Sequence, residues 1–269
     1  TTTAKGAKEA KESFSFPDRS TQTDKAMENQ TFPQNPSYIG TGEVSSVRAF
    51  LSNVFSYMAL ALVISGVMAW WFGTDPALFQ LLFDPATGRQ TFLGWVVLLA
   101  PLGLVLLMGG LVQRMSGMAL LLTFLAFSTI MGISLSYIFL IYAMSAIVNV
   151  FFLSAAVFGV MAVAGYTTRT DLTKLGSILM IGLIGIVIAS LVNVFLKSST
   201  MDYVVSIIGV VVFTGLTAYD VQKLKRMGEV VATGTEAAQK MALMGALSLY
   251  LDFINLFLML LRLFGGRRD

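Results

Sequence analysis

One carboxylate, Asp252, lies near the middle of a twenty-residue apolar stretch, residues 242–261. A charged side chain at the centre of a bilayer costs about 3 kcal/mol or more, so such residues usually face a partner or a water-filled path. Residues at steps of three and four share one face of an α-helix. We therefore expect a membrane helix with one polar seam, around which the rest of the chain is arranged. Its members are Gly245, Ser248, Asp252, Asn255 and Met259.

Asp220 is the other acidic residue that falls inside a predicted span, and Thr217 lies on the same helix face. Two carboxylates brought together in a low-dielectric site cannot both ionise cheaply, so the pair can share a proton. Such a pair would titrate near neutral pH in a chain that has no His. Carboxylate oxygens also suit a hard cation such as Ca²⁺. Asp220 and Asp252 are therefore candidates for proton sensing and for transient Ca²⁺ binding.

The residues alone leave a second arrangement open, in which the two acids are independent. Asp220 would be solvated near the interface, and Asp252 would be hydrogen-bonded to a Ser or an Asn. If both helices start at the same level, the two carboxylates differ in depth by about 10 Å. A sixth helix that continues beyond the membrane surface, or a seventh that starts deeper, would close this gap.

The composition indicates an all-α membrane protein. The 269 residues are 56% hydrophobic and 12% charged, against about 25% charged in soluble domains, and the mean hydropathy is +0.77. The absence of Cys excludes disulfides and thiolate metal sites, and the absence of His excludes His-based catalysis. A net charge of +3 is too small to suggest nucleic acid. With no evident nucleophile and base, phosphate loop or HExxH pattern, we expect neither an enzyme nor a cofactor.

Stretches of low charge predict seven transmembrane helices. Residues 115–168 carry no charge, and because one span needs about 20 residues, this segment must hold two helices with a turn near 142–149. A basic linker, residues 223–240, is expected before the last helix. The expected spans are residues 49–74, 92–112, 117–142, 146–166, 175–196, 203–224 and 242–261.

Three parts are expected along the chain: a flexible polar tail at 1–46, the seven-helix domain at 47–265, and a short tail at 266–269. Eight Lys and Arg residues flank the spans on the amino-terminal side and five on the other. The positive-inside rule then places the amino terminus in the cytoplasm. The short tail after the last span, with no retention signal, favours a bacterial inner membrane.

Arg114, at the end of the second span, is the nearest plausible cationic partner for the two acids. Its simpler interpretation is an anchor whose side chain extends to the membrane surface.

Three motifs resemble the Bax inhibitor family of membrane proteins. They are Gly165 to Leu172 after the fourth span, Ala218 to Leu224 at the end of the sixth, and Ala246 to Phe257 in the seventh. The segment Met131 to Ser136 also fits. The resemblance covers roughly residues 45 to 265, and the motif of the seventh span is its most specific part.

This resemblance implies six helices surrounding a central seventh. It also implies a proton-sensitive calcium leak channel gated by a hydrogen-bonded aspartate pair, here Asp220 and Asp252. An arginine on the second helix contacts the pair in one state, and Arg114 is the residue at that place. The long tail and the longer link, residues 227–240, depart from compact bacterial members. They keep a second function open, a non-conducting accessory subunit of a membrane complex such as a protease, docking through the tail or this link.

Overall fold

The computed structural model describes residues 37–87, 89–232 and 234–266. The first 36 residues of the predicted tail and residues 267–269 of the predicted short tail lie outside the described residues. Helix α2 begins at Ser37, so the end of the predicted tail is helical. By its contacts the chain divides into residues 1–42 and 43–269, and all the candidate membrane spans belong to the second unit.

Seven helices of the described part are long and apolar enough to cross a membrane, which confirms the predicted spans. The third span is made of two helices in line, because α5 ends at Leu135 and α6 starts at Ile138. The helices are α2 (Ser37–Thr74), α4 (Phe92–Leu111), α5 (Gly117–Leu135), α6 (Ile138–Ile141), α7 (Met144–Thr167), α8 (Thr173–Leu196), α9 (Ser199–Val230) and α10 (Glu236–Phe264).

The connection between α2 and α4 is folded rather than open. Asp75 caps the short helix α3 (Pro76–Leu82) by accepting hydrogen bonds from the N–H groups of Ala77 and Leu78. A hairpin follows, in which β1 (Phe83–Asp84) pairs antiparallel with β2 (Arg89–Gln90). The dipeptides Asp75-Pro76 and Asp84-Pro85, a pattern typical of turns, begin this helix and the hairpin turn.

Two predicted connections are wrong in length. The turn expected at 142–149 is only Tyr142 and Ala143, because α7 already begins at Met144. The linker expected at 223–240 is reduced to 231–235, because α9 continues to Val230 and α10 begins at Glu236. The basic segment stays helical because its apolar face packs against other helices. Leu224 is buried, and Gly228 lies beside Phe50 and Val47 of α2. Thr235 then caps α10.

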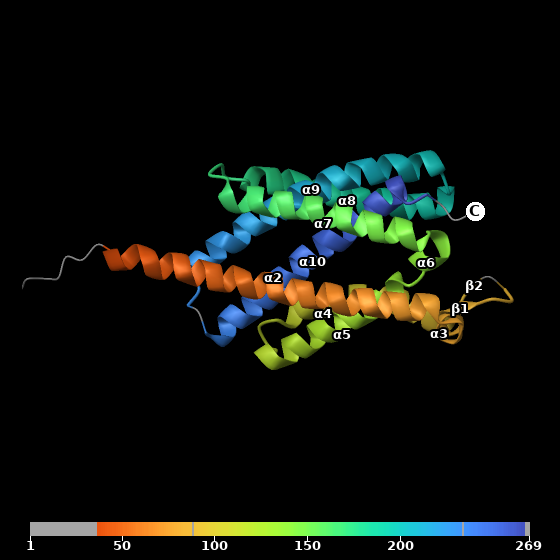
Figure 1. Ribbon diagram of the computed structural model, residues 1–269, viewed down its shortest axis with the longest axis horizontal. Coiled ribbons are helices and arrows are strands. Elements are labelled where there is room, and N and C mark those ends of the chain that lie inside the picture. Colours follow the sequence, from red (N-terminus) through yellow and green to blue (C-terminus); the bar gives the residue numbers. More distant parts are fainter. Residues whose placement is uncertain (1–36, 88, 233, 267–269) are drawn as a thin grey trace, which may run out of the picture. The chain divides into compact units, whose positions relative to one another are not determined.

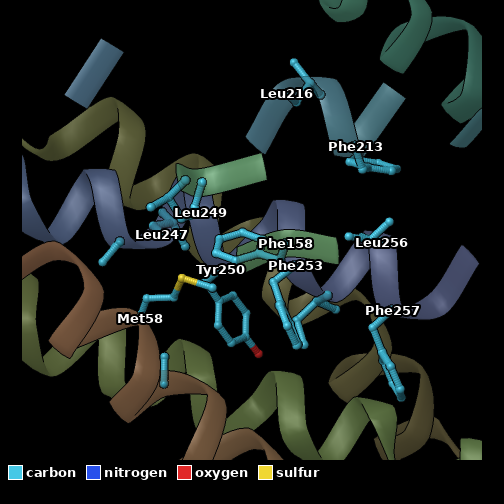
Figure 2. Packing of buried hydrophobic residues seen from close by; sticks show 14 of the residues in the cluster. Met58, Phe158, Phe213, Leu216, Leu247, Leu249, Tyr250, Phe253, Leu256 and Phe257 are labelled. Carbon is cyan, nitrogen blue, oxygen red and sulfur yellow. The ribbon is translucent and has the colours of Figure 1, made fainter. Parts of the chain in front are cut away.

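Helix α10 is the most buried of the seven, with 72% of its apolar window inside the protein, against 11–50% for the others. It packs against α9, α7 and α5, and Figure 1 shows it running between α2, α4 and α5 on one side and α7, α8 and α9 on the other. Its side chains form the centre of the apolar core shown in Figure 2. The full ring of six helices around α10 stays a prediction.

Two glycines let pairs of helices approach at the level of their backbones. A Cβ at Gly132 of α5 would collide with the backbone of Ser65 in α2, and a Cβ at Gly165 of α7 would collide with the carbonyl of Ala218 in α9. Glycine at such positions is how membrane helices pack most closely. The result is two tightly joined pairs, α2 with α5 and α7 with α9, with α10 between them (Figure 1).

Candidate functional site

The polar seam of α10 contacts α9, and its centre is a hydrogen bond between the two helices. The Ser248 hydroxyl donates to Oδ2 of Asp220 at 2.6 Å. Ser248 lies four residues, about one helical turn, before Asp252 on α10. The two acids are therefore at neighbouring levels of the α9–α10 interface, with Ser248 as the partner of Asp220.

Asp252 is buried, with 7% of its surface exposed, and its Oδ2 has no hydrogen-bond partner among the described residues. Asn255 of the seam and Thr217 of α9 are hydrogen-bonded to carbonyls of their own helices. The Asn255 amide donates to the carbonyl of Leu251 at 2.8 Å, and the Thr217 hydroxyl to that of Phe213 at 2.8 Å. A buried carboxylate oxygen without a donor is costly. A site that keeps such a group is typical of function rather than of packing.

Arg114 lies in the turn between α4 and α5 and is exposed. Its backbone N–H bonds the carbonyl of Leu111 at 2.8 Å. No described residue offers its guanidinium a hydrogen bond or an ion pair. In this structure Arg114 is thus a surface residue, and its contact with the two acids stays a prediction.

A cavity of about 210 Å³ leads to Asp220 from the end of the bundle where α9 extends and α10 begins. Asp220 and Ser248 line it together with Lys223 and three methionines, Met227, Met241 and Met244. The positive charge of Lys223 acts on Asp220. Lys223 follows Asp220 by three residues on α9, a spacing that places the two side chains on the same helix face.

Beyond the acids, the α9–α10 interface is filled with apolar side chains. Phe213 and Leu216 of α9 and Leu256 of α10 are buried, and Figure 2 shows them around the central helix. A second cavity of about 210 Å³ lies at the far end, lined by Asn193, Asp202 and Arg262. There Arg262 Nη1 and Asp202 Oδ1 form an ion pair at 3.2 Å.

A second interhelical hydrogen bond joins α10 to α2. The hydroxyls of Ser65 and Tyr250 lie 2.7 Å apart, and Ser65 also donates to the carbonyl of Ala61. Both residues are almost fully buried. Neither residue was predicted as a site residue, although a hydroxyl in the middle of each span was a usable signal.

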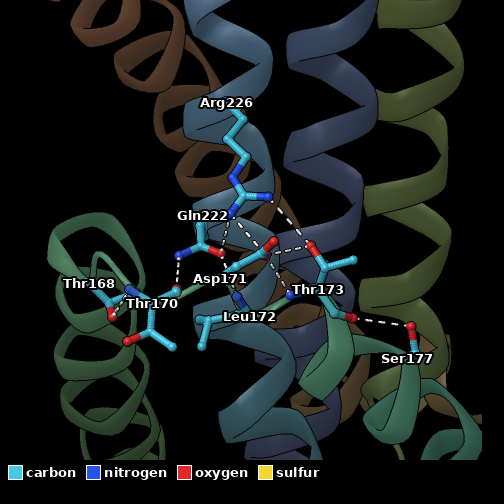
Figure 3. A network of polar contacts seen from close by, with 8 residues as sticks. All are labelled: Thr168, Thr170, Asp171, Leu172, Thr173, Ser177, Gln222 and Arg226. Atoms are coloured by element: carbon cyan, nitrogen blue, oxygen red, sulfur yellow. Dashed lines mark hydrogen bonds and ion pairs between the residues drawn. The ribbon is translucent and has the colours of Figure 1, made fainter.

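The α7–α8 loop is bound to the extended end of α9 by the polar network in Figure 3. Arg226 pairs with Asp171 at 2.9 Å, and the Gln222 side chain accepts from the N–H of Leu172 and donates to the carbonyl of Thr170. Hydrogen bonds from Thr173, then from Arg226, lower the pKa of Asp171 to about 2. Most of these residues belong to two of the family motifs, and the network explains their presence structurally.

The described residues include no group of three or more Asp, Glu, His or Cys side chains that could hold a metal ion. Resident Ca²⁺ normally takes six to eight oxygen ligands. Asp220 and Asp252 alone supply fewer oxygen ligands than that.

Comparison with known proteins agrees with this architecture. The family model "Inhibitor of apoptosis-promoting Bax1" matches residues 47–269. The inner membrane protein YbhL of Escherichia coli is 42% identical over 238 residues, which is 88% of this chain and 99% of that protein. The uncharacterized protein RP147 of Rickettsia prowazekii is 44% identical over 223 residues, covering 83% of this chain and 92% of that one. The chain therefore belongs to the Bax inhibitor family of membrane proteins.

Proposed function

We propose that the protein is a proton-sensitive cation leak channel, most suited to Ca²⁺, in which Asp220 and Asp252 form the gate. The observation that carries this proposal is the pairing of one acid at the end of a cavity with a second, buried acid one helical turn from the same serine. Charged groups that face this position are the two carboxylates and Lys223.

In this proposal the described conformation is closed. A cation could enter the cavity of about 210 Å³ and reach Asp220, but Phe213, Leu216 and Leu256 fill the interface beyond it. Opening would need α10 to move relative to α9. A proton can shift that equilibrium only by binding the two states differently, by about 1.4 kcal/mol for each unit of pKa difference between them.

The orientation follows from the charges at the two ends of the bundle. The excess of Lys and Arg at the end where α9 extends favours a cytoplasmic amino terminus. Asp220 would then be reached from the cytoplasm, and the ion pair of Arg262 with Asp202 would lie on the periplasmic side of a bacterial inner membrane.

The experiment is Ca²⁺ flux into liposomes that carry the purified protein, measured from pH 5 to 8. Asp220→Asn and Asp252→Asn are compared with Asp75→Asn, which changes an acid in the α2–α3 connection and keeps a side chain able to cap α3. The proposal expects a pH-dependent flux that both seam variants alter and the control leaves unchanged. Unaltered pH dependence in Asp252→Asn would overturn the gating mechanism.

A folded protein that gives no flux above empty liposomes would favour the accessory-subunit function. A partner that co-purifies in mild detergent and is lost on deletion of residues 1–46 would then support it. The segment between α9 and α10 offers a partner little surface for docking, because the connection is only residues 231–235.

A further inference from the structure

A cavity of about 300 Å³ lies between α2, α6, α7 and α10, separate from the cavity at Asp220. Its floor is formed by Phe253, Ile254 and Phe257, the turn of α10 that follows Asp252. Its volume is at the lower end of the range of small-molecule sites, and twice that of an engineered 150 Å³ cavity that binds benzene. The space is large enough to hold a ligand.

The lining is almost entirely apolar, and its one hydroxyl is already engaged. Ser65 lines the cavity, but its hydroxyl is hydrogen-bonded both to Tyr250 and to the carbonyl of Ala61. Water needs two to four polar partners to occupy a cavity. An apolar ligand such as a hydrocarbon chain therefore fits this cavity better than water does.

The cavity opens at the outer surface of the helix bundle. Five of its large apolar lining side chains are exposed, most of all Phe152 at 67% and Trp70 at 53%. In a membrane these surfaces contact lipid. The floor packs against α7, where Phe253 and Phe257 make edge-to-face contacts with Phe151 at centroid distances of 5.5 and 6.2 Å.

The depth of the cavity matches one leaflet. It runs along α2 from Trp70 to Leu62, eight residues that rise about 12 Å, and half of a hydrocarbon core is about 15 Å. Trp70 is four residues from the end of α2, where an indole favours the headgroup region. A chain that enters beside Trp70 would thus have its headgroup at the membrane surface and its tail in the cavity.

We propose that this cavity binds one acyl chain of a phospholipid from the leaflet in which α2 ends. The inference does not depend on ion conduction, because it rests on the shape, chemistry and depth of the cavity alone.

Photolabelling in a bilayer tests it. The protein is reconstituted in phosphatidylethanolamine and phosphatidylglycerol vesicles that contain a phosphatidylcholine with a diazirine near the end of one acyl chain. Labelled residues are then mapped by mass spectrometry. We expect labelling of the cavity residues of α2 and α7 to exceed labelling of Ile181 and Ile188, which are exposed on α8.

Two glycines provide matched variants. A Cβ at Gly66, which lines the cavity, or at Gly103 of α4, which does not, would meet open space. Gly66→Phe should fill the cavity and lower its labelling about tenfold, equivalent to about 1.4 kcal/mol of binding free energy. Gly103→Phe should leave it unchanged.

The proposal would be overturned if the cavity residues are labelled no more than the exposed residues of α8, or if their labelling persists in folded Gly66→Phe. The signal would then come from bulk lipid. If Gly66→Phe does not fold, Val148→Phe at the cavity serves instead, with Val160→Phe on the same helix as its control.

Discussion

The hydroxyl of Ser248 on α10 donates a hydrogen bond of 2.6 Å to Oδ2 of Asp220 on α9. A donated hydrogen bond favours the ionised form of a carboxylate. If the flux responds to protonation of this group, Ser248→Ala should move the midpoint of its pH dependence to higher pH. Ser206→Ala is the control, since the hydroxyl of Ser206 bonds a carbonyl of its own helix. If the pH dependence of flux has the same midpoint in both variants, Ser248 takes no part in gating.

Asp252 keeps a buried oxygen without a donor among the described residues, so the protein should be more stable without it. We expect Asp252→Leu to raise the free energy of unfolding by about 1 kcal/mol or more while it abolishes the pH response. Asn255→Leu should give no such gain, because the amide of Asn255 is hydrogen-bonded. Thermal unfolding in detergent at pH 7 measures both, and a destabilised Asp252→Leu would contradict the prediction.

The bond between Ser65 and Tyr250 should show an asymmetric mutational cost. Tyr250→Phe leaves Ser65 with its bond to Ala61, whereas Ser65→Ala leaves the buried Tyr250 hydroxyl without its partner. Ser65→Ala should therefore destabilise the protein more. A double-mutant cycle of unfolding free energies should give a coupling near 0.6 kcal/mol, about the average for hydrogen bonds between membrane helices. Zero coupling would mean that the bond does not form in the membrane.

Gly165 should be intolerant of any side chain. Gly165→Ala forces a Cβ into the backbone of Ala218 and should cost about 1–3 kcal/mol. Gly159 lies in the same helix with open space around its Cβ position, so Gly159→Ala should be neutral or stabilising by less than about 1 kcal/mol. Unfolding in detergent compares the two, and equal effects would contradict the close approach of α7 and α9.

The network of Asp171 should stabilise the protein at neutral pH and fail in acid. The pKa of Asp171 is lowered to about 2, from an ordinary value near 3.9. Its contribution is therefore complete above about pH 4 and is lost as the pH falls towards 2. The melting temperature of Asp171→Ala should be below that of the wild type at pH 7 and converge with it near pH 2. Glu229→Ala, which removes an exposed acid at the same end of α9, is the control and should leave the melting temperature at pH 7 unchanged.

Hydropathy was enough to predict the seven spans, because a bilayer requires about twenty apolar residues in each. It could not predict where helices end outside the apolar region. Helix α9 runs on to Val230 through basic residues because Leu224 and Gly228 find apolar partners in other helices. The same continuation places Asp220 deep enough to meet Ser248.

The polar seam could be predicted from spacing, but its pairing could not. The residues alone allowed Asp252 to bond a Ser or an Asn. In the structure Ser248 is hydrogen-bonded to Asp220 instead, and an oxygen of Asp252 has no donor among the described residues. Which partner a hydroxyl selects depends on the rotation of α9 against α10. That rotation is determined by contacts such as Gly209 with Met259, which a single sequence does not reveal.

Glycine contacts bring α2 close to α5 and α7 close to α9. Helix α10 is hydrogen-bonded to one pair through Tyr250 and to the other through Ser248, two residues apart. These two helix pairs therefore cannot separate without breaking one of these bonds. Because α10 also packs against both α7 and α9, a separation that breaks the Tyr250 bond would leave Asp252 beside α9.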